Sequence, residues 1–348
     1  MRLPYTSRHL QACTSNRGQH IDKEDAAVKS LAASISIVFT LMGMASAQTQ
    51  TEFPTRTVTL VVTQAPGGGM DTTARLLARK MTDALGQSVI VENRPGGAEN
   101  VAIGYVSKAN PDGYTILLCS NSVTINPGLY KNLLYDAKKD LRPIGRVGTS
   151  PLVIVTQASE PYGTVAEMAA YAKANPTKLS YGSPGTGTTH HMSMELIKSK
   201  TGAPIQHIPY RGAAPGMNDL LAGVIPIYVS STSAAEPHMA SGKVRGIVTI
   251  SKTRLAQFNQ IPTLTEALPG VEIESWMGMF APAGIPKPVE EKLANALKTV
   301  LNDPDVGALM ERGGTIPRWL SPDELAATMI RDEERWAGVI RDAGIKAE

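Results

Sequence analysis

The sequence is poor in cysteine, in aromatic residues and in charge of either sign. It has 2 cysteines in 348 residues, and 19% of the residues are charged while 5% are aromatic. Residues 1–47 hold five basic and three acidic side chains, so the remainder has 29 basic and 28 acidic ones, a net charge of +1. This balance lacks the basic surface that binds phosphate backbones, and we expect no nucleic-acid partner. With 42% hydrophobic residues, the chain is long enough for two packed domains.

Motifs for a disulfide, a metal or a cofactor are also missing. Cys13 lies in the first 47 residues, which leaves Cys119 without an intramolecular partner once that segment is removed. His190 and His191 are adjacent, so on a helix they point about 100° apart and cannot hold one metal ion together. We expect neither a metal nor a cofactor.

No apolar run is long enough for a comfortable bilayer span, but one has the length of a signal-peptide core. Residues 31–44 follow Lys29 and precede the small residues Ala45-Ser46-Ala47. We expect export to the periplasm and cleavage near Ala47. Residues 1–28 mix acids, bases and histidines, which is unusual ahead of such a core. Residues 1–47 are therefore predicted to be a signal peptide with an N-terminal over-extension, and translation is expected to start near Val28.

A glycine-rich stretch, residues 64–72, separates a strand-like run from a helix-like run; we name it the first glycine loop. Residues 58–63 are short and β-branched, typical of a buried strand, and apolar residues from Ala74 onward recur at helical spacing. The first N–H groups of such a helix are unpaired and favour an anion. Alternatively, the glycines only permit positive φ or close packing. The candidate ligand residues are Pro66, Gly67, Gly68, Gly69, Asp71 and Thr72.

A second glycine loop, residues 181–189, again lies between a strand-like and a helix-like segment. Two such turns that face each other predict a cleft, and their N–H and hydroxyl donors can hold a carboxylate without a full countercharge. Small polar residues also follow the strand-like residues 114–119 at the same sheet edge. These segments contribute the candidates Ser183, Gly185, Thr186, Gly187, Thr188, Asn121 and Ser122.

From residue 53 onward, strand-like and helix-like segments alternate, which predicts an α/β fold with mainly parallel sheets covered by helices. Residues 276–282 are expected to return the chain to the first domain, so domain 1 comprises residues 52–149 and 275–348, and domain 2 residues 150–274. The last helix opens with Ser321 as N-cap and Glu324 in a capping box. Strands are expected at residues 58–63, 88–92, 114–119, 152–156, 179–182, 205–208, 225–230 and 245–250, and residues 126–140 are expected to be a loop.

Catalytic motifs do not fit these loops. The first loop lacks the third glycine of a dinucleotide fingerprint, and neither loop has the lysine of a P-loop. Ser183 lies at a strand-to-helix turn with His190 and His191 nearby, but Tyr181 occupies the position of the first glycine in a nucleophile elbow. Asp71 is either paired with Arg75 in the first helical turn or a ligand residue.

Several stretches agree, in order, with one known family. They are Pro66-Gly67-Gly68 with Asp71, Val91 to Gly96, Asn110 to Tyr114, Tyr181 to Thr188, Pro209-Tyr210-Arg211-Gly212, Ser275-Trp276 and Ala281 to Gly284. From Phe53 to its end, the chain resembles the Bug family, the periplasmic solute-binding receptors of tripartite tricarboxylate transporters. The resemblance implies a two-domain Venus-flytrap fold of the periplasmic-binding-protein type, with a small carboxylate held in the interdomain cleft, and no enzymatic activity.

The resemblance also implies partners and further ligand residues. The expected partners are a di- or tricarboxylate or an aromatic acid, and two TctA- and TctB-like membrane subunits; the receptor itself is expected to be a monomer. Arg211 either binds a second carboxylate or only fixes its turn, and Tyr210 is placed at the ligand rim. Ser230 is a further candidate; it lies in the strand end Tyr228-Val229-Ser230-Ser231, where relatives often carry an aspartate-rich strand end, which makes an amino-acid ligand less expected.

Two alternatives to the transport receptor stay open. A receptor of the same fold that serves a signalling partner would have the same sequence features. An exported serine hydrolase using Ser183 with His190 or His191 is the alternative from a different class.

The first prediction concerns the N-terminus. Mass spectrometry of the exported protein should find Gln48 or a neighbouring residue first, because cleavage is expected after the small residues that end at Ala47. A mature protein that retains residues 1–30 would contradict both the cleavage site and the later start.

Overall fold

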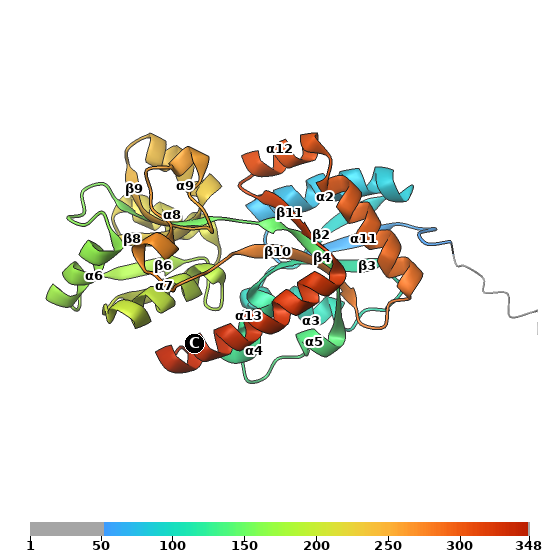
Figure 1. Cartoon of the computed structure of the whole chain (residues 1–348), viewed down its shortest axis with the longest axis horizontal. Coiled ribbons are helices and arrows are strands. Elements are labelled where there is room, and N and C mark those ends of the chain that lie inside the picture. Colours follow the sequence, from blue (N-terminus) through green and yellow to red (C-terminus); the bar gives the residue numbers. More distant parts are fainter. Residues whose placement is uncertain (1–51, 347–348) are drawn as a thin grey trace, which may run out of the picture. The chain divides into compact units, whose positions relative to one another are not determined.

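The computed structural model describes residues 52–346, so the predicted signal peptide, Cys13 and the Ala47 cleavage point lie outside the described residues. Two β-sheets, each flanked by helices, make up residues 53–346 (Figure 1). None of the helices in this part of the chain combines the length and apolarity needed to cross a bilayer.

The first sheet has six strands in the order β11-β4-β10-β3-β1-β2. The strands β1, β2 and β3 are parallel, as expected, whereas β10 runs antiparallel to both β3 and β4. The sheet is mixed because β4 leads out of it toward the second sheet and β10 brings the chain back. The bounds are β1 (Val58–Val62), β2 (Val89–Asn93), β3 (Thr115–Ser120), β4 (Leu141–Thr149), β10 (Trp276–Pro282) and β11 (Ile316–Leu320).

The second sheet has five strands in the order β7-β6-β8-β5-β9. Here β6, β7 and β8 are parallel, and β5 is antiparallel to β8 and β9. In both sheets, therefore, three parallel strands carry the strand-to-helix turns. The bounds are β5 (Leu152–Gln157), β6 (Ser180–Ser183), β7 (Gln206–Pro209), β8 (Ile227–Ser231) and β9 (Val244–Ile250).

The structure contains the helices expected from the sequence and several elements that were not expected. The expected loop at residues 126–140 is wrong in part, because α4 covers its start and α5 its end; the helices α10 and α12 and the strands β4 and β11 were also not predicted. α4 contains Pro127 and few strong helix formers, but it buries Val123 and Ile125 completely. Tertiary packing therefore overrides its weak propensity. The helices are α2 (Gly69–Leu85), α3 (Asn100–Val106), α4 (Ser122–Leu129), α5 (Ala137–Asp140), α6 (Val165–Ala174), α7 (Thr189–Thr201), α8 (Ala213–Ala222), α9 (Thr232–Ala240), α10 (Leu264–Ala267), α11 (Lys287–Leu301), α12 (Pro304–Arg312) and α13 (Pro322–Ala343), with 3-10 turns η1 (Gly97–Glu99) and η2 (Ala256–Phe258).

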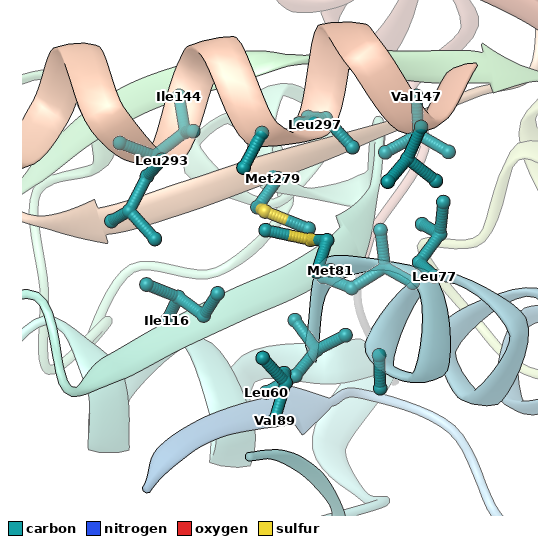
Figure 2. Close-up of a cluster of buried hydrophobic side chains, with 14 of the residues drawn as sticks. Leu60, Leu77, Met81, Val89, Ile116, Ile144, Val147, Met279, Leu293 and Leu297 are labelled. Carbon is teal, nitrogen blue, oxygen red and sulfur yellow. The ribbon is translucent and has the colours of Figure 1, made fainter. Parts of the chain in front are cut away.

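Side chains along the strands of the first sheet point alternately to its two faces, and helices pack against both faces. Side chains such as Leu60 and Met279 pack against Met81 of α2 and Leu293 of α11 on one face (Figure 2). The intervening positions, such as Leu117, pack on the opposite face against α3, α4 and α13. The predicted capping box of α13 is confirmed, because Ser321 and Glu324 exchange hydrogen bonds.

Two chain segments connect the sheets, and several bonds hold them together. The backbone N–H of Ser150, between β4 and β5, donates to the carbonyl of Ser275 at 2.9 Å. The buried Arg146 guanidinium lies 2.8 Å from the Glu274 carboxylate. Asn121 Nδ2 donates to the Glu274 carbonyl at 3.1 Å. The two segments that connect the sheets are therefore held to each other by a hydrogen bond and an ion pair, and Asn121 is bonded to one of them.

The second prediction concerns the core. Leu293→Ala should lower the free energy of unfolding by about 2–5 kcal/mol, because it leaves a cavity among fully buried side chains. Urea denaturation measures the loss. Ile330→Ala on α13, where half of the side chain is exposed, is the control and should change stability by less than about 0.5 kcal/mol. Equal losses in the two variants would contradict the assigned packing.

Candidate functional site

The Asp71 carboxylate, which is only 3% exposed, bonds to the first glycine loop from its buried side. Asp71 Oδ2 accepts from Gly67 N at 2.9 Å and from Arg75 Nε at 3.0 Å, and Oδ1 accepts from Asn93 Nδ2 at 2.9 Å. Burial raises the pKa of this carboxyl, but the bonds from Arg75, Gly67 and Asn93 outweigh it and leave the pKa below its ordinary value. The predicted pairing with Arg75 is thus confirmed, and the carboxylate positions the loop.

The start of α2 has no side-chain cap. Its N-cap residue is Gly68, and Gly67 has a φ of 85°, which a glycine adopts without strain. Pro66, Gly67, Gly69 and Thr72 are exposed. Gly67 N and Thr72 N donate to Asp71 and to the Gly68 carbonyl, so the N–H groups of Gly68 and Gly69 are the ones that stay accessible to an anion, unlike those of a helix that a serine or aspartate caps.

The second glycine loop is shaped by its own hydroxyl groups. Ser183 Oγ is fully buried, donates to the Gly185 carbonyl at 3.2 Å and accepts from Gly185 N at 3.3 Å. Thr188 is the N-cap of α7: its Oγ1 accepts from His191 N at 3.3 Å and donates to the Gly185 carbonyl at 2.7 Å. Gly187 has a φ of 85°. Both hydroxyls thus fix the loop conformation.

Two histidines lie under this loop. His207 Nε2 is 2.7 Å from Ser183 Oγ, and His191 Nδ1 accepts from Gly187 N at 3.3 Å. Their rings are 4.2 Å apart, and Tyr181 stacks on His207 at 4.8 Å. Burial lowers the pKa of His191 to about 4 and that of His207 to about 3, the latter with a smaller contribution from His191 and Lys198. Both rings are neutral at neutral pH, as the Nδ1 acceptor of His191 requires.

The helix α4, which the sequence did not predict, connects the first sheet to the second loop. Asn121 Oδ1 accepts from Thr189 Oγ1 at 2.6 Å, and both side chains are buried. Tyr130 OH donates to the Thr186 carbonyl at 3.4 Å. A Cβ added to Gly187 would lie 2.9 Å from Asn126 Oδ1. The candidate Asn121 is therefore bonded to the second glycine loop at Thr189, the candidate Thr186 contacts Tyr130, and Asn126 is a functional candidate that the sequence did not reveal.

The remaining predicted residues lie around these loops. Ser122 is buried, with its Oγ 2.9 Å from Ser120 Oγ. Tyr210 OH donates to Asp219 at 2.7 Å, and Tyr210 N donates to the Ser183 carbonyl at 2.9 Å. Arg211 is exposed and forms no ion pair within residues 52–346. Ser230, 1% exposed, has a hydroxyl without a hydrogen-bond partner in the described part of the chain.

The serine-hydrolase alternative required Ser183 to pair with His190 or His191, and the structure shows a different partner. The imidazole at hydrogen-bond distance belongs to His207, because the parallel pairing of β6 and β7 sets His207 opposite Tyr181. Ser183 Oγ is fully buried and already bonded within its loop, so a substrate carbonyl cannot reach it. Within residues 52–346, no group of three His, Cys, Asp or Glu side chains could hold a metal ion.

The third prediction concerns pH. Because the folded-state pKa values of His191 and His207 lie below the ordinary value of 6.5, the unfolded chain binds more protons between about pH 6.5 and 4. Stability should therefore fall as the pH drops through this window. His207→Gln should reduce that fall by more than about 2 °C in Tm.

The control is His238→Gln in the last turn of α9, outside both glycine loops, and it should retain the wild-type pH profile. Thermal melts at half-unit pH steps make the comparison. Parallel profiles for wild type and His207→Gln would contradict a neutral, buried His207.

Comparison with known proteins identifies the family of the chain. The model of the tripartite tricarboxylate transporter family receptor, TctC, matches residues 73–345. Protein BugT of Bordetella pertussis is 32% identical over 319 residues, which cover 91% of this chain and 98% of BugT. Another Bordetella pertussis protein, of the group UPF0065, is 35% identical over 322 residues, 92% of this chain and 99% of that protein.

Solved structures agree with the sequence relatives. The periplasmic binding protein BugD has a TM-score of 0.77 at 34% identity, covering 85% of this chain and 100% of its own. A R. palustris protein solved with adipate has a TM-score of 0.79 at 32% identity, with coverages of 85% and 100%. MatC from Rhodopseudomonas palustris, solved with bound malate, has a TM-score of 0.76 at 29% identity, with coverages of 83% and 100%. The chain therefore belongs to the tripartite tricarboxylate transporter receptor family, the Bug family of periplasmic solute-binding receptors, whose members bind solutes rather than catalyse reactions.

Proposed function

We propose that this receptor captures a small carboxylate between the two glycine loops and delivers it to the membrane subunits of a tripartite tricarboxylate-type transporter. In this proposal, residues 52–149 with 275–348 and residues 150–274 are the two domains that close on the ligand. The mature protein acts in the periplasm as a monomer.

The observation that carries the proposal is the uncapped start of α2. Gly68 provides no side-chain cap, so the N–H groups of the first turn are free for a ligand carboxylate. The carboxylate inside the first turn, Asp71, is bonded to Gly67, Arg75 and Asn93, so its charge is largely compensated. A carboxylate at the helix start therefore gains the N–H groups and the helix dipole without a strong opposing charge from Asp71.

Two buried polar atoms support a ligand at the second loop. Asn126 Oδ1 and Ser230 Oγ have no hydrogen-bond partner in the described residues. Leaving such groups unpaired costs about 1–3 kcal/mol each, which a bound ligand or an ordered water would recover. Asn126 faces Gly187, and Ser230 is the second-last residue of β8, the strand beside β6.

The ligand class comes from chemistry and from the relatives. Backbone amides and hydroxyls bind carboxylates by charge-assisted hydrogen bonds. The relatives solved with adipate and malate hold dicarboxylates. We assign this chain a di- or tricarboxylate or an aromatic acid.

The fourth prediction is a ligand-dependent thermal shift. In a panel of di- and tricarboxylates and aromatic acids, at least one member should raise Tm, because a ligand at 100 times its Kd stabilises the folded state by about 2.7 kcal/mol. A folded protein whose Tm no panel member changes would overturn the carboxylate assignment.

Ser183→Ala tests the second loop in the same assay. Loss of the bonds that Ser183 makes to Gly185 and His207 should weaken binding by about 1–3 kcal/mol. Ser199→Ala, at an exposed position of α7, is the matched control and should bind like the wild type. Unchanged affinity in Ser183→Ala would remove Ser183 from the site.

A further inference from the structure

A strained turn lies next to the two glycine loops. Among the described residues other than glycine, only Ala98 and Glu99 have positive φ, at 51° and 77°. Such conformations cost free energy and persist only where surrounding contacts impose them. Here Asn126 Nδ2 donates to the Ala98 carbonyl and to Asn100 Oδ1, both at 2.8 Å, and Tyr135 OH donates to Asn100 Oδ1 at 2.6 Å.

The strain places the Glu99 carboxyl in the interior, where it is 5% exposed. Its Oε2 accepts from Ser120 N at 3.0 Å, and its Oε1 accepts from Ser120 Oγ at 2.8 Å and from Gln64 Nε2 at 3.4 Å. Burial raises the pKa of this carboxyl, and the bonds from Ser120, Thr63 and Gln64 oppose that rise. No cation pairs with Glu99 within residues 52–346, so its charge is not compensated as that of Asp71 is.

Two of the segments proposed to bind ligand contact this carboxyl, and the third lies beside the neighbouring residue Ala98. Gln64 belongs to the first glycine loop, and Ser120 immediately precedes the candidates Asn121 and Ser122. On the side of the second loop, a Cβ added to Gly187 would lie 3.4 Å from the Cβ of Ala98. Glu99 therefore stands at the wall where the first sheet meets the second loop.

We propose that Glu99 is a specificity-determining residue of the carboxylate site, which selects a ligand whose end away from the binding amides is neutral and donates hydrogen bonds. The inference rests on the proposed function and, among the ligand classes assigned there, it favours an acid with one carboxylate, such as an aromatic acid, over a di- or tricarboxylate. One carboxylate is bound by the N–H groups at the helix starts. A second ligand carboxylate near Glu99 is repelled by the Glu99 carboxylate, because water screens the two charges poorly at a buried position. The repulsion is avoided only when Glu99 takes up a proton, and in both cases the ligand loses affinity at neutral pH.

This is the fifth prediction, and the test compares two ligands of equal size. Adipate and its monoamide differ only in the charge and hydrogen-bond donors of one end. Their affinities are measured at neutral pH by competition against the strongest ligand of the thermal-shift panel. The wild type should bind the monoamide at least about tenfold more tightly than adipate.

Glu99→Gln preserves size and removes the charge, so the preference should fall by about tenfold or more. Glu92→Gln on β2, where the carboxylate is 40% exposed and paired with Arg94, is the matched control and should retain the wild-type preference. Thermal melts confirm that both variants are folded.

The outcomes separate the two proposals. If no carboxylate of the panel binds, the proposed function fails. If carboxylates bind but the wild type prefers adipate, or the preference is the same in Glu99→Gln, the role of Glu99 is overturned while the receptor function stands. The wild-type preference decides the question even if Glu99→Gln does not fold.

Discussion

The candidate site depends on one constraint: the first N–H groups of α2 must stay unpaired and still be held in place. A serine or aspartate N-cap would hold the turn but occupy those donors. This chain has Gly68 at the N-cap and a carboxylate one turn away, inside the helix. Asp71 reaches back to Gly67 N, so the loop is fixed from the buried side while its outer side stays open. Arg75 and Asn93 donate hydrogen bonds to Asp71 and compensate its buried negative charge.

The second glycine loop is also held in place from its buried side, but by neutral groups. His207 and His191 contact Ser183 and the Gly187 amide from the buried side, and the absence of charge on either ring avoids a cation under the loop. Thr188 caps α7, so fewer of its amides are free than at α2. The two loops are thus unequal: the first offers more free donors, and the second closes against α4 through Thr189 and Asn121.

Much of this arrangement follows from local sequence. The β-branched strand before residues 64–72, the buried stripe of α2 and the Asp71–Arg75 spacing predict a strand, a turn and a helix, and all three are present. The second glycine loop is found by the same signals. Local patterns suffice here because each element is specified by its own hydrophobic period and by glycine positions that need positive φ.

The contacts that sequence reasoning missed are those made by tertiary structure. The pairing of Ser183 with His207 joins residues 24 apart in the chain through two neighbouring parallel strands, while the adjacent His190 and His191 gave a misleading local signal. α4 is helical because it buries Val123 and Ile125, not because its residues favour a helix. No sequence motif marks Glu99, because its proposed role depends on the positive φ angles of Ala98 and Glu99 and on the burial of its side chain, which only the fold reveals.

The most direct test of the account is made at the amides themselves. Backbone N–H resonances of Gly68, Gly69 and Thr188 can be followed by NMR while a carboxylate that stabilises the protein is added. The account predicts that the Gly68 and Gly69 amide protons shift downfield and exchange more slowly at saturation, because they donate to the ligand carboxylate. A ligand that saturates the protein and raises its Tm while these resonances and their exchange rates stay unchanged would contradict it.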